Sequence, residues 1–341
     1  MFIRMHERLR FLFRQESQPV PGQLPSDQTA AHALRPVPQF LRDNHISIDE
    51  ARLGQIERSI RENYHTGWRS EANYSAEAYQ EDLNSHLNLR LIGDRLTVVP
   101  WLAAAQPLRD QRVLEIGCGT GSSTVALAEQ GAKVLGVDID EGALAVARDR
   151  CIAYGVTAEF RSLNADRILE AFVPGSFDTI IYFAALEHMT IAERLKSLGS
   201  AWAMLASGGL LVIIETPNRL WYEDGHTALL PFYHWLPNEL AFHYSHLSHR
   251  GNFKELYREY DAPSKHHFLR RGRGMSFHEL DLAIAPAKGL EVVSSLRSYD
   301  PVSRGPYSRL ACDYKAILER IYPDIHSAFF DEYLDIIIRK N

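Results

Sequence analysis

A strand–turn–helix–strand pattern between residues 113 and 140 constrains this chain more than any other feature of its sequence. Residues 113–121 read Val-Leu-Glu-Ile-Gly-Cys-Gly-Thr-Gly, an apolar run that leads into a glycine-rich turn. Residues 134–140 read Val-Leu-Gly-Val-Asp-Ile-Asp, a second apolar run that ends in a carboxylate, Asp138. The distance from the first glycine to Asp138 is close to the ~20 residues found in a βαβ unit that binds a mononucleotide. The pattern therefore predicts a site for an adenosine-type cofactor.

From residue 112 onward, short apolar runs alternate with helical stretches. We expect strands at 112–117, 133–138, 158–163, 177–184, 209–215, 290–297 and 333–338. We expect helices at 121–130, 141–153, 190–206 and 276–288. The strands are nearly continuous apolar runs, which is typical of a sheet covered on both faces. Short parallel strands joined by helices predict an α/β protein with a doubly wound, mostly parallel sheet of seven strands.

The first 105 residues precede this unit and have a different composition. Residues 15–45 are rich in Pro, Gln and Ser, and 1–45 are expected to form an N-terminal arm and linker. A helical extension follows over 46–105. Its first helix should begin at a capping box, with Ser47 at the N-cap and Glu50 three residues later. Further helices are expected at 75–91 and 94–105.

Residues 220–275 interrupt the alternation of strands and helices. They are rich in histidine and aromatic residues, and they read as an insertion between the fifth strand and the next helix. The cofactor-binding core therefore comprises 106–219 and 276–341. Because ligands of open α/β sheets bind at the carboxyl ends of the strands, the extension and the insertion are the two segments available to cover a substrate there.

Composition limits the partners and the compartment. The net charge of −6 provides no general basic field for nucleic acid, and no apolar run is long enough for a membrane span. The three cysteines, Cys118, Cys151 and Cys312, have no paired metal spacing, so we expect a reducing, cytoplasmic environment. Residues 1–14 mix arginine with apolar side chains. We favour a helix that packs on the domain or on a partner over a membrane-surface helix or an organelle presequence.

The glycine-rich turn departs from the dinucleotide pattern in a way that selects the cofactor. A dehydrogenase turn reads G-x-G-x-x-G and faces a pyrophosphate. Here the glycines follow G-x-G-x-G, and Glu115 lies two residues before the first. A carboxylate repels a pyrophosphate but attracts a sulfonium and an ammonium group. The turn therefore favours S-adenosylmethionine.

This stretch resembles the class I S-adenosylmethionine-dependent methyltransferases, over about 112–219 and 276–341, which implies the Rossmann-like methyltransferase fold. The resemblance implies that the turn approaches the methionine part of the cofactor through Glu115, Gly117, Cys118, Gly119 and Gly121. Asp138 matches the acidic residue that accepts both ribose hydroxyls, and Ile139 is expected to pack on the adenine. Asn164 and Ala165 stand where the family often has Asp-Ala against the adenine amino group. Asn164 departs from that pattern, although its side-chain carbonyl can accept the same bond.

The fourth strand ends in Phe183-Ala-Ala-Leu-Glu187-His188, and its Leu-Glu-His segment resembles the branch of quinone-biosynthesis methyltransferases. Because this strand end lies over the cofactor sulfur, His188 is a candidate general base. The alternative is a histidine that bonds a backbone carbonyl and holds the loop. Phe183 and Glu187 are expected to contact the cofactor, or Glu187 only caps the helix that follows.

The insertion offers candidates for the substrate side. Asn218, Arg219 and Asp224 are expected to face a polar substrate, and Phe232 and Trp235 to wall its pocket. Tyr222 and His226 are further catalytic candidates. The alternative is an ordinary aromatic core with His226 bonded locally. His243, His246 and His249 drift around a helix without a carboxylate or cysteine to complete a set, so we expect no metal.

Four functions remain open from sequence alone. We favour a methyltransferase that acts on an O, N or C nucleophile of a small molecule, by SN2 transfer in a closed site. The main alternative is an enzyme of the same fold that cleaves S-adenosylmethionine on its aminocarboxypropyl side, for example to azetidine-2-carboxylate, and releases methylthioadenosine. RNA or protein methylation is less favoured, and the intact Glu115, Gly117, Gly119 and Asp138 argue against a non-catalytic scaffold. We expect a small-molecule substrate as the partner, and a homodimer is possible.

Overall fold

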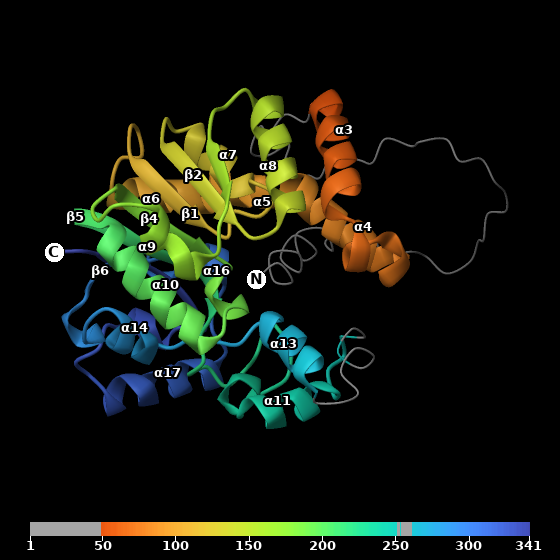
Figure 1. The fold of residues 1–341 in the computed structure, drawn as a ribbon. Coiled ribbons are helices and arrows are strands. Elements are labelled where there is room, and N and C mark those ends of the chain that lie inside the picture. The colour runs from red at the N-terminus through yellow and green to blue at the C-terminus, as the bar shows by residue number, and fades with distance from the viewer. Residues whose placement is uncertain (1–48, 251–252, 254–260) are drawn as a thin grey trace, which may run out of the picture.

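A computed structural model describes residues 49–250, 253 and 261–341 (Figure 1). The arm expected over 1–45, Ser47 and part of the expected insertion lie outside these residues. Within them, no helix is long and apolar enough to cross a membrane.

A single seven-stranded sheet organises the molecule (Figure 1). Its strands are β1 Arg112–Ile116, β2 Lys133–Asp138, β3 Glu159–Ser162, β4 Phe177–Phe183, β5 Leu205–Pro217, β6 Glu291–Ser295 and β7 Tyr333–Arg339. The strand order is β3-β2-β1-β4-β5-β7-β6. β7 runs antiparallel to both of its neighbours, whereas the other pairs are parallel. The predicted doubly wound, mostly parallel sheet is therefore confirmed.

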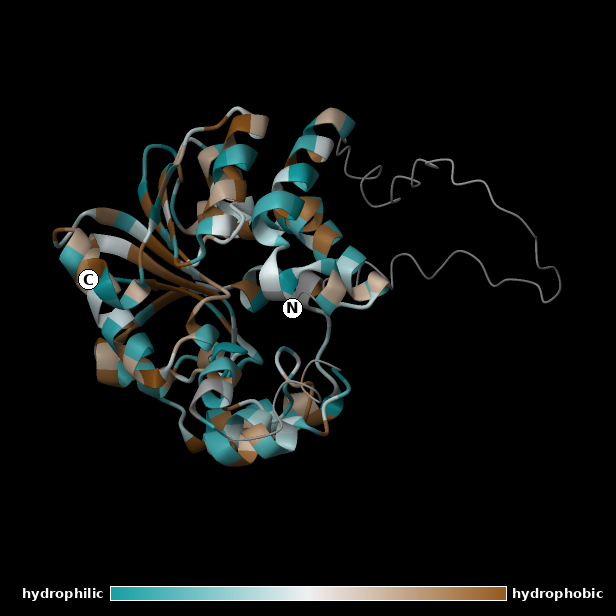
Figure 2. Cartoon of the chain, turned by 45° about the vertical axis from the view of Figure 1, so that its right-hand side comes forward, coloured by the Kyte–Doolittle hydropathy of each residue, from teal (hydrophilic) through white to brown (hydrophobic). Residues whose placement is uncertain are grey.

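Helices cover both faces of this sheet. On one face, α10 (Ile191–Met204) and α14 (Phe277–Ala283) pack on strand residues such as Tyr182 and Ile213. On the other face, α6 (Val99–Ala105) and α7 (Ser122–Ala128) form a second apolar cluster with the strands. Figure 2 shows the strands as the most hydrophobic band of the molecule, as expected for a sheet buried on both sides.

The helix that precedes β3 shows why the core helices begin and end where they do. α8 spans Glu141–Tyr154, and the Asp140 side chain caps it by accepting the Ala143 N–H at 3.1 Å. It ends at Gly155, whose φ of 67° is the left-handed conformation common at helix ends. The remaining core helices are α9 Ile168–Ala171, α15 Leu296–Tyr299, α16 Pro301–Arg304 and α17 Arg309–Ile321.

Two helix predictions are wrong in detail. The first helix of the extension, α3 (Glu50–Ser59), takes Asp49 as its N-cap, because the Asp49 carboxylate accepts the Arg52 N–H at 3.0 Å. The helix predicted over 276–288 ends at Ala283, close to Pro286, which cannot supply a helical N–H.

The extension continues as one helical path. α4 (Ala76–Asn84), α5 (Arg90–Gly93) and α6 are joined by two wider turns over Ser85–Leu89 and Asp94–Val98, so the two predicted helices are fused. The region after β5 contains α11 (Asn238–Ser245) and α13 (Ala262–Arg270) around its own small apolar cluster, which includes Tyr233, Phe242 and Phe268.

Candidate functional site

The glycine-rich turn is wedged between β4 and α8. Gly117 has a φ of +77°, and a Cβ atom there would lie 2.7 Å from the Ala185 Cβ, just beyond β4. Gly121 also has a φ of +77°, and its Cβ would lie 2.8 Å from the Ala147 Cβ of α8. Both positions therefore require glycine for backbone conformation and for close approach.

Gly119 differs from these two glycines, because its outer side is open. Its φ is +50°, and no described atom lies within 4 Å of the place a Cβ would take. Its N–H donates to Asp138 Oδ2 at 2.9 Å, and the Asp140 N–H donates to Asp138 Oδ1 at 3.0 Å. Burial raises the pKa of Asp138, against the opposing effect of these backbone N–H groups. Next to it, Ile139 exposes 67% of its surface. The turn, the carboxylate and an exposed apolar side chain thus lie together at the carboxyl edge of the sheet.

Glu115 lies beneath the turn. Its side chain is fully buried and accepts the hydroxyls of Ser123 and Thr124, both in α7. Burial raises its pKa to about 7, although the two hydroxyls lower it. Glu115 therefore ties the first strand to α7, and its influence on a ligand is by charge.

The other predicted cofactor residues differ in exposure. Cys118 is buried against Gly136 of β2, and burial raises the pKa of its thiol well above the usual range. Ala165 is buried, Phe183 is half-buried, and Asn164 is exposed at the start of the 165–167 turn.

His188 has a defined tautomer. Its Nδ1 lies 2.8 Å from the Arg270 carbonyl oxygen, and a carbonyl can only accept, so Nδ1 carries the proton. In the neutral ring Nε2 then carries the lone pair, and the side chain is 43% exposed. Desolvation by the surrounding protein lowers the pKa of His188, but the tautomer follows from geometry alone. The hydrogen bond from Nδ1 to the Arg270 carbonyl holds the loop in place, as the alternative interpretation of His188 expected. The same bond leaves Nε2 unprotonated and so able to act as a base.

Glu187 lies between two histidines. Its side chain is fully buried, and its Oε1 lies 3.7 Å from Nε2 of both His188 and His226. That oxygen has no hydrogen-bond partner among the described residues, while Oε2 lies 3.5 Å from the Thr216 hydroxyl. Burial raises the pKa of Glu187 to about 8. The alternative that Glu187 caps the next helix is wrong, because Thr190 and Glu193 form that capping box.

His226 reaches this cluster from the region after β5. Its side chain is 17% exposed, and its ring centroid lies 6.1 Å from that of His188. Burial lowers the pKa of His226 well below the usual range. Glu187, His188 and His226 are therefore brought together although 38 residues separate the last two in sequence.

Two residues predicted to face the substrate instead use their side chains in hydrogen bonds to the protein backbone. Asp224 is buried and accepts four backbone N–H groups, those of residues 226–229, at 2.5–3.1 Å. These bonds and the nearby His234 hold the pKa of its carboxyl far below normal, although burial opposes them. Asn218 donates to the carbonyls of Phe329 and Asp331 and accepts the Leu220 N–H. Both side chains hold the loop after β5 in place.

The aromatic candidates for the substrate side pack around Tyr314 of α17. Tyr222 and Trp235 lie 5.2 and 6.4 Å from the Tyr314 ring, and Phe232 lies 4.9 Å from Trp235. Phe232 and Trp235 are 47% and 41% exposed. Arg219 is half-buried, and its N–H donates to the Met275 carbonyl at 2.8 Å. Among the described residues, no group of His, Cys, Asp or Glu could hold a metal ion.

Sequence reasoning missed two arginines beside the turn. Arg150, fully buried in α8, donates to the carbonyls of His86, Leu87 and Thr120. Arg69 pairs with Asp140. A signal for Arg150 exists in the sequence, since it stands among the apolar residues of an otherwise buried helix face.

The strand order, the antiparallel seventh strand and the glycine-rich turn define an α/β cofactor-binding fold of the methyltransferase type. Residues 113–209 match the family described as "Methyltransferase domain". The chain is 34% identical over 121 residues to a ubiquinone biosynthesis O-methyltransferase of Pseudomonas aeruginosa, which covers 36% of this chain and 50% of that protein. A protein of the same description from Methylococcus capsulatus is 33% identical over 119 residues, with 35% and 48% covered. Among solved structures, an S-adenosylmethionine-bound amino pentose methyltransferase from Micromonospora echinaspora is 26% identical, with a TM-score of 0.33 over 39% of this chain and 54% of that one.

Residues 113–209 of this chain are therefore similar to a methyltransferase domain, and the chain resembles ubiquinone biosynthesis O-methyltransferases over 36% of its length. It spans about half the length of the curated relatives it matches.

Proposed function

We propose that this protein is an S-adenosylmethionine-dependent methyltransferase that acts on a hydroxyl group of a small molecule. The observation that carries the proposal is the arrangement of Gly119 and Asp138. The open side of Gly119 leaves room for a ligand against the turn, and the turn itself fixes the carboxylate that would hold it.

The described residues fit this cofactor. Asp138 is held by two N–H groups, which orient its carboxylate for the ribose hydroxyls. Ile139 presents apolar surface for an adenine, and Asn164 and Ala165 follow β3 at the same edge of the sheet. Near a cationic ligand, the buried Glu115 would favour its charged form. When bound, the cofactor supplies an electrophilic methyl group.

Two observations favour oxygen as the acceptor atom. The curated relatives are described as O-methyltransferases. A hydroxyl also loses a proton during transfer, and His188 Nε2 is a neutral lone pair suited to accept it. Glu187 lies beside that nitrogen and beside His226, and burial raises its pKa to about 8.

We further propose that the extension over 46–105 and the insertion over 220–275 cover the site, and that His226 is the insertion residue closest to the chemistry. Arg219, Tyr222, Phe232 and Trp235 are proposed to contribute on the substrate side. Asn218 and Asp224 would act by holding the loop that carries them.

Identification of the by-product tests the proposal. The protein is incubated with S-adenosylmethionine, alone and with a panel of phenols and catechols, and the nucleoside product is identified by mass spectrometry. We expect S-adenosylhomocysteine, formed only with an acceptor, and loss of cofactor binding in Asp138→Ala. Methylthioadenosine formed without an acceptor would instead establish cleavage of the cofactor, and unchanged binding by Asp138→Ala would overturn the assigned site.

A further inference from the structure

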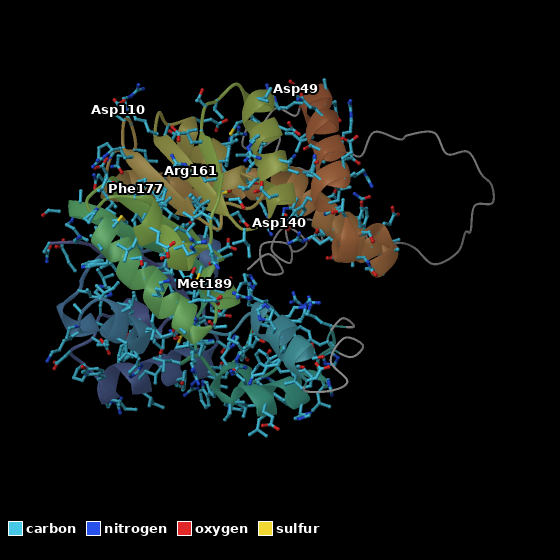
Figure 3. All side chains as sticks on the ribbon, in the orientation of Figure 1. Asp49, Asp110, Asp140, Arg161, Phe177 and Met189 are labelled. Atoms are coloured by element: carbon cyan, nitrogen blue, oxygen red, sulfur yellow. The ribbon has the colours of Figure 1, made fainter. Side chains whose placement is uncertain are left out.

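The extension is linked to Asp138, the proposed ribose-binding acid, through two successive contacts, and Asp138 in turn contacts the glycine-rich turn. Arg69 Nη1 lies 2.5 Å from Asp140 Oδ2. The Asp140 N–H donates to Asp138 Oδ1 at 3.0 Å, and Asp138 Oδ2 accepts the Gly119 N–H at 2.9 Å. A side chain of the extension is thus two residues away from the carboxylate on which cofactor binding is proposed to depend. Figure 3 shows Asp140 at the edge of the sheet that faces the extension.

The ion pair between Arg69 and Asp140 is more than a solvated surface contact. Their side chains are only 22% and 29% exposed, and the Arg69 guanidinium lies 4.2 Å from the centre of the Tyr64 ring. Hydrogen bonds from Arg69 and the Ala143 N–H lower the pKa of Asp140, against the effect of burial. Both Asp140 oxygens are therefore engaged, one by α8 and the other by the extension.

The same part of the extension also contacts the glycine-rich turn. The Tyr64 ring lies 4.7 Å from the His86 ring, and His86 Nδ1 lies 3.2 Å from the Thr120 hydroxyl. Arg150 joins the His86 and Thr120 carbonyls from below. The contacts therefore run from Asp138 through Arg69 and Tyr64 back to the turn, around the two segments that would hold the cofactor.

We propose that Arg69 is a positioning residue for the ribose of the cofactor, acting through Asp140 on the carboxylate of Asp138. The inference rests on the proposed function, because it assigns Arg69 to that cofactor. Without the guanidinium, Asp140 loses one of its two anchors, and the N–H that orients Asp138 is less fixed. Ribose hydroxyls then meet a carboxylate of less defined orientation.

A second ion pair provides a matched control. Arg95 also belongs to the extension and pairs with Glu129 at 2.5 Å, with side chains 33% and 24% exposed. Glu129 stands at the carboxyl end of α7, away from the turn at its start. If ion pairs serve only to dock the extension, loss of either pair should affect ligand binding alike.

Calorimetric titration of the full chain with S-adenosylhomocysteine tests the inference without catalysis. We expect Arg69→Gln and Asp140→Asn each to raise the Kd for S-adenosylhomocysteine about tenfold, because each removes the ion pair. Asparagine is chosen at position 140 because its side-chain oxygen can still cap α8. Arg95→Gln should stay within about twofold of the wild type. In an Asp138→Asn background, Arg69→Gln should add nothing further, because its effect passes through that carboxylate. Thermal unfolding identifies any variant that has lost its fold, and Asp140→Asn then carries the test.

Two other results of the titration would contradict a proposal. Unchanged Kd in Arg69→Gln, or an equal loss in Arg95→Gln, overturns the positioning role while the proposed function stands. A wild-type protein that binds no S-adenosylhomocysteine contradicts the proposed function itself.

Discussion

At the scale of single residues, Gly117 and Gly119 share a left-handed backbone but serve different needs. Gly117 is enclosed, with Ala185 in the space a side chain would need, whereas nothing described occupies that space at Gly119. The first glycine is therefore required by the fold. The open side of Gly119 is instead the proposed place of the ligand.

Alanine substitutions separate these two requirements. Gly119→Ala should lower the free energy of unfolding by about 1 kcal/mol, because alanine is strained at a positive φ. It should also lose S-adenosylhomocysteine binding, because the added Cβ lies on the side proposed for the ligand. Gly155→Ala, at a φ of +67° with open space, carries the same backbone cost and should bind normally. Gly117→Ala should lose more stability than either. Normal binding by Gly119→Ala, measured by calorimetry, would show that no ligand lies against this residue.

His188 is the residue whose chemistry a pH profile can test. Burial lowers the pKa of His188, so the ring stays neutral to a lower pH than a free histidine does. We expect kcat to fall as pH drops through the lowered pKa, and His188→Asn to lower kcat by about 10²- to 10⁴-fold and to abolish this limb. Asparagine can still donate to the Arg270 carbonyl, so the loop should be kept. An unchanged kcat in His188→Asn would leave His188 a structural role only.

At the scale of elements, the sequence predicts what periodicity and turn chemistry encode. All seven predicted strands overlap observed ones, and the four predicted core helices overlap α7, α8, α10 and α14. The sequence pattern does not indicate α17, and β3 is a polar strand rather than an apolar run. The β5 edge is not indicated either: Glu215 has a φ of 61°, and the pairing with β7 shifts between Ile213 and Thr216. Such a bulge depends on the partner strand, so alternation within β5 cannot indicate it. The site divides likewise, since Asp138 follows from spacing, whereas the approach of His226 to Glu187 is a tertiary contact.

The extension approaches α8 so closely at one position that only glycine fits there. A Cβ at Gly142 would lie 2.1 Å from the Asn63 carbonyl oxygen. Helix propensity alone predicts that Gly142→Ala stabilises α8, so a loss of about 1–3 kcal/mol in urea unfolding would measure the steric clash. Gly54→Ala, in α3 with open space, should instead gain up to about 1 kcal/mol. Equal gains in both variants would show that the extension does not pack on α8 as described.

At the scale of the whole molecule, buried carboxyls make stability depend on pH. Glu115 and Glu187 are fully buried, and burial raises their pKa values to about 7 and about 8. Asp94, also buried, has its pKa raised well above normal by burial and by the nearby Glu215 and Glu115. At a pH between the unfolded-state and folded-state pKa values of such a group, the folded protein holds a proton that the unfolded chain has released. The contribution of these carboxyls to stability is therefore present at low pH and is lost as pH rises through the folded-state pKa.

Glu187→Gln isolates one of these groups in the ligand-free protein. Between pH 5 and pH 8, Glu187 should make the wild-type free energy of unfolding fall with a slope of up to about 1.4 kcal/mol per pH unit, because one proton is at stake. Glutamine resembles the protonated acid and cannot titrate, so the variant should show a shallower fall and its relative stability should improve towards pH 8.

Glu193 serves as the control, since its bonds to Arg270 lower its pKa against the effect of burial. Its contribution changes only below that range, so Glu193→Gln should run parallel to the wild type in urea unfolding at pH 5, 6, 7 and 8. If Glu187→Gln also runs parallel, Glu187 is already ionised at pH 5.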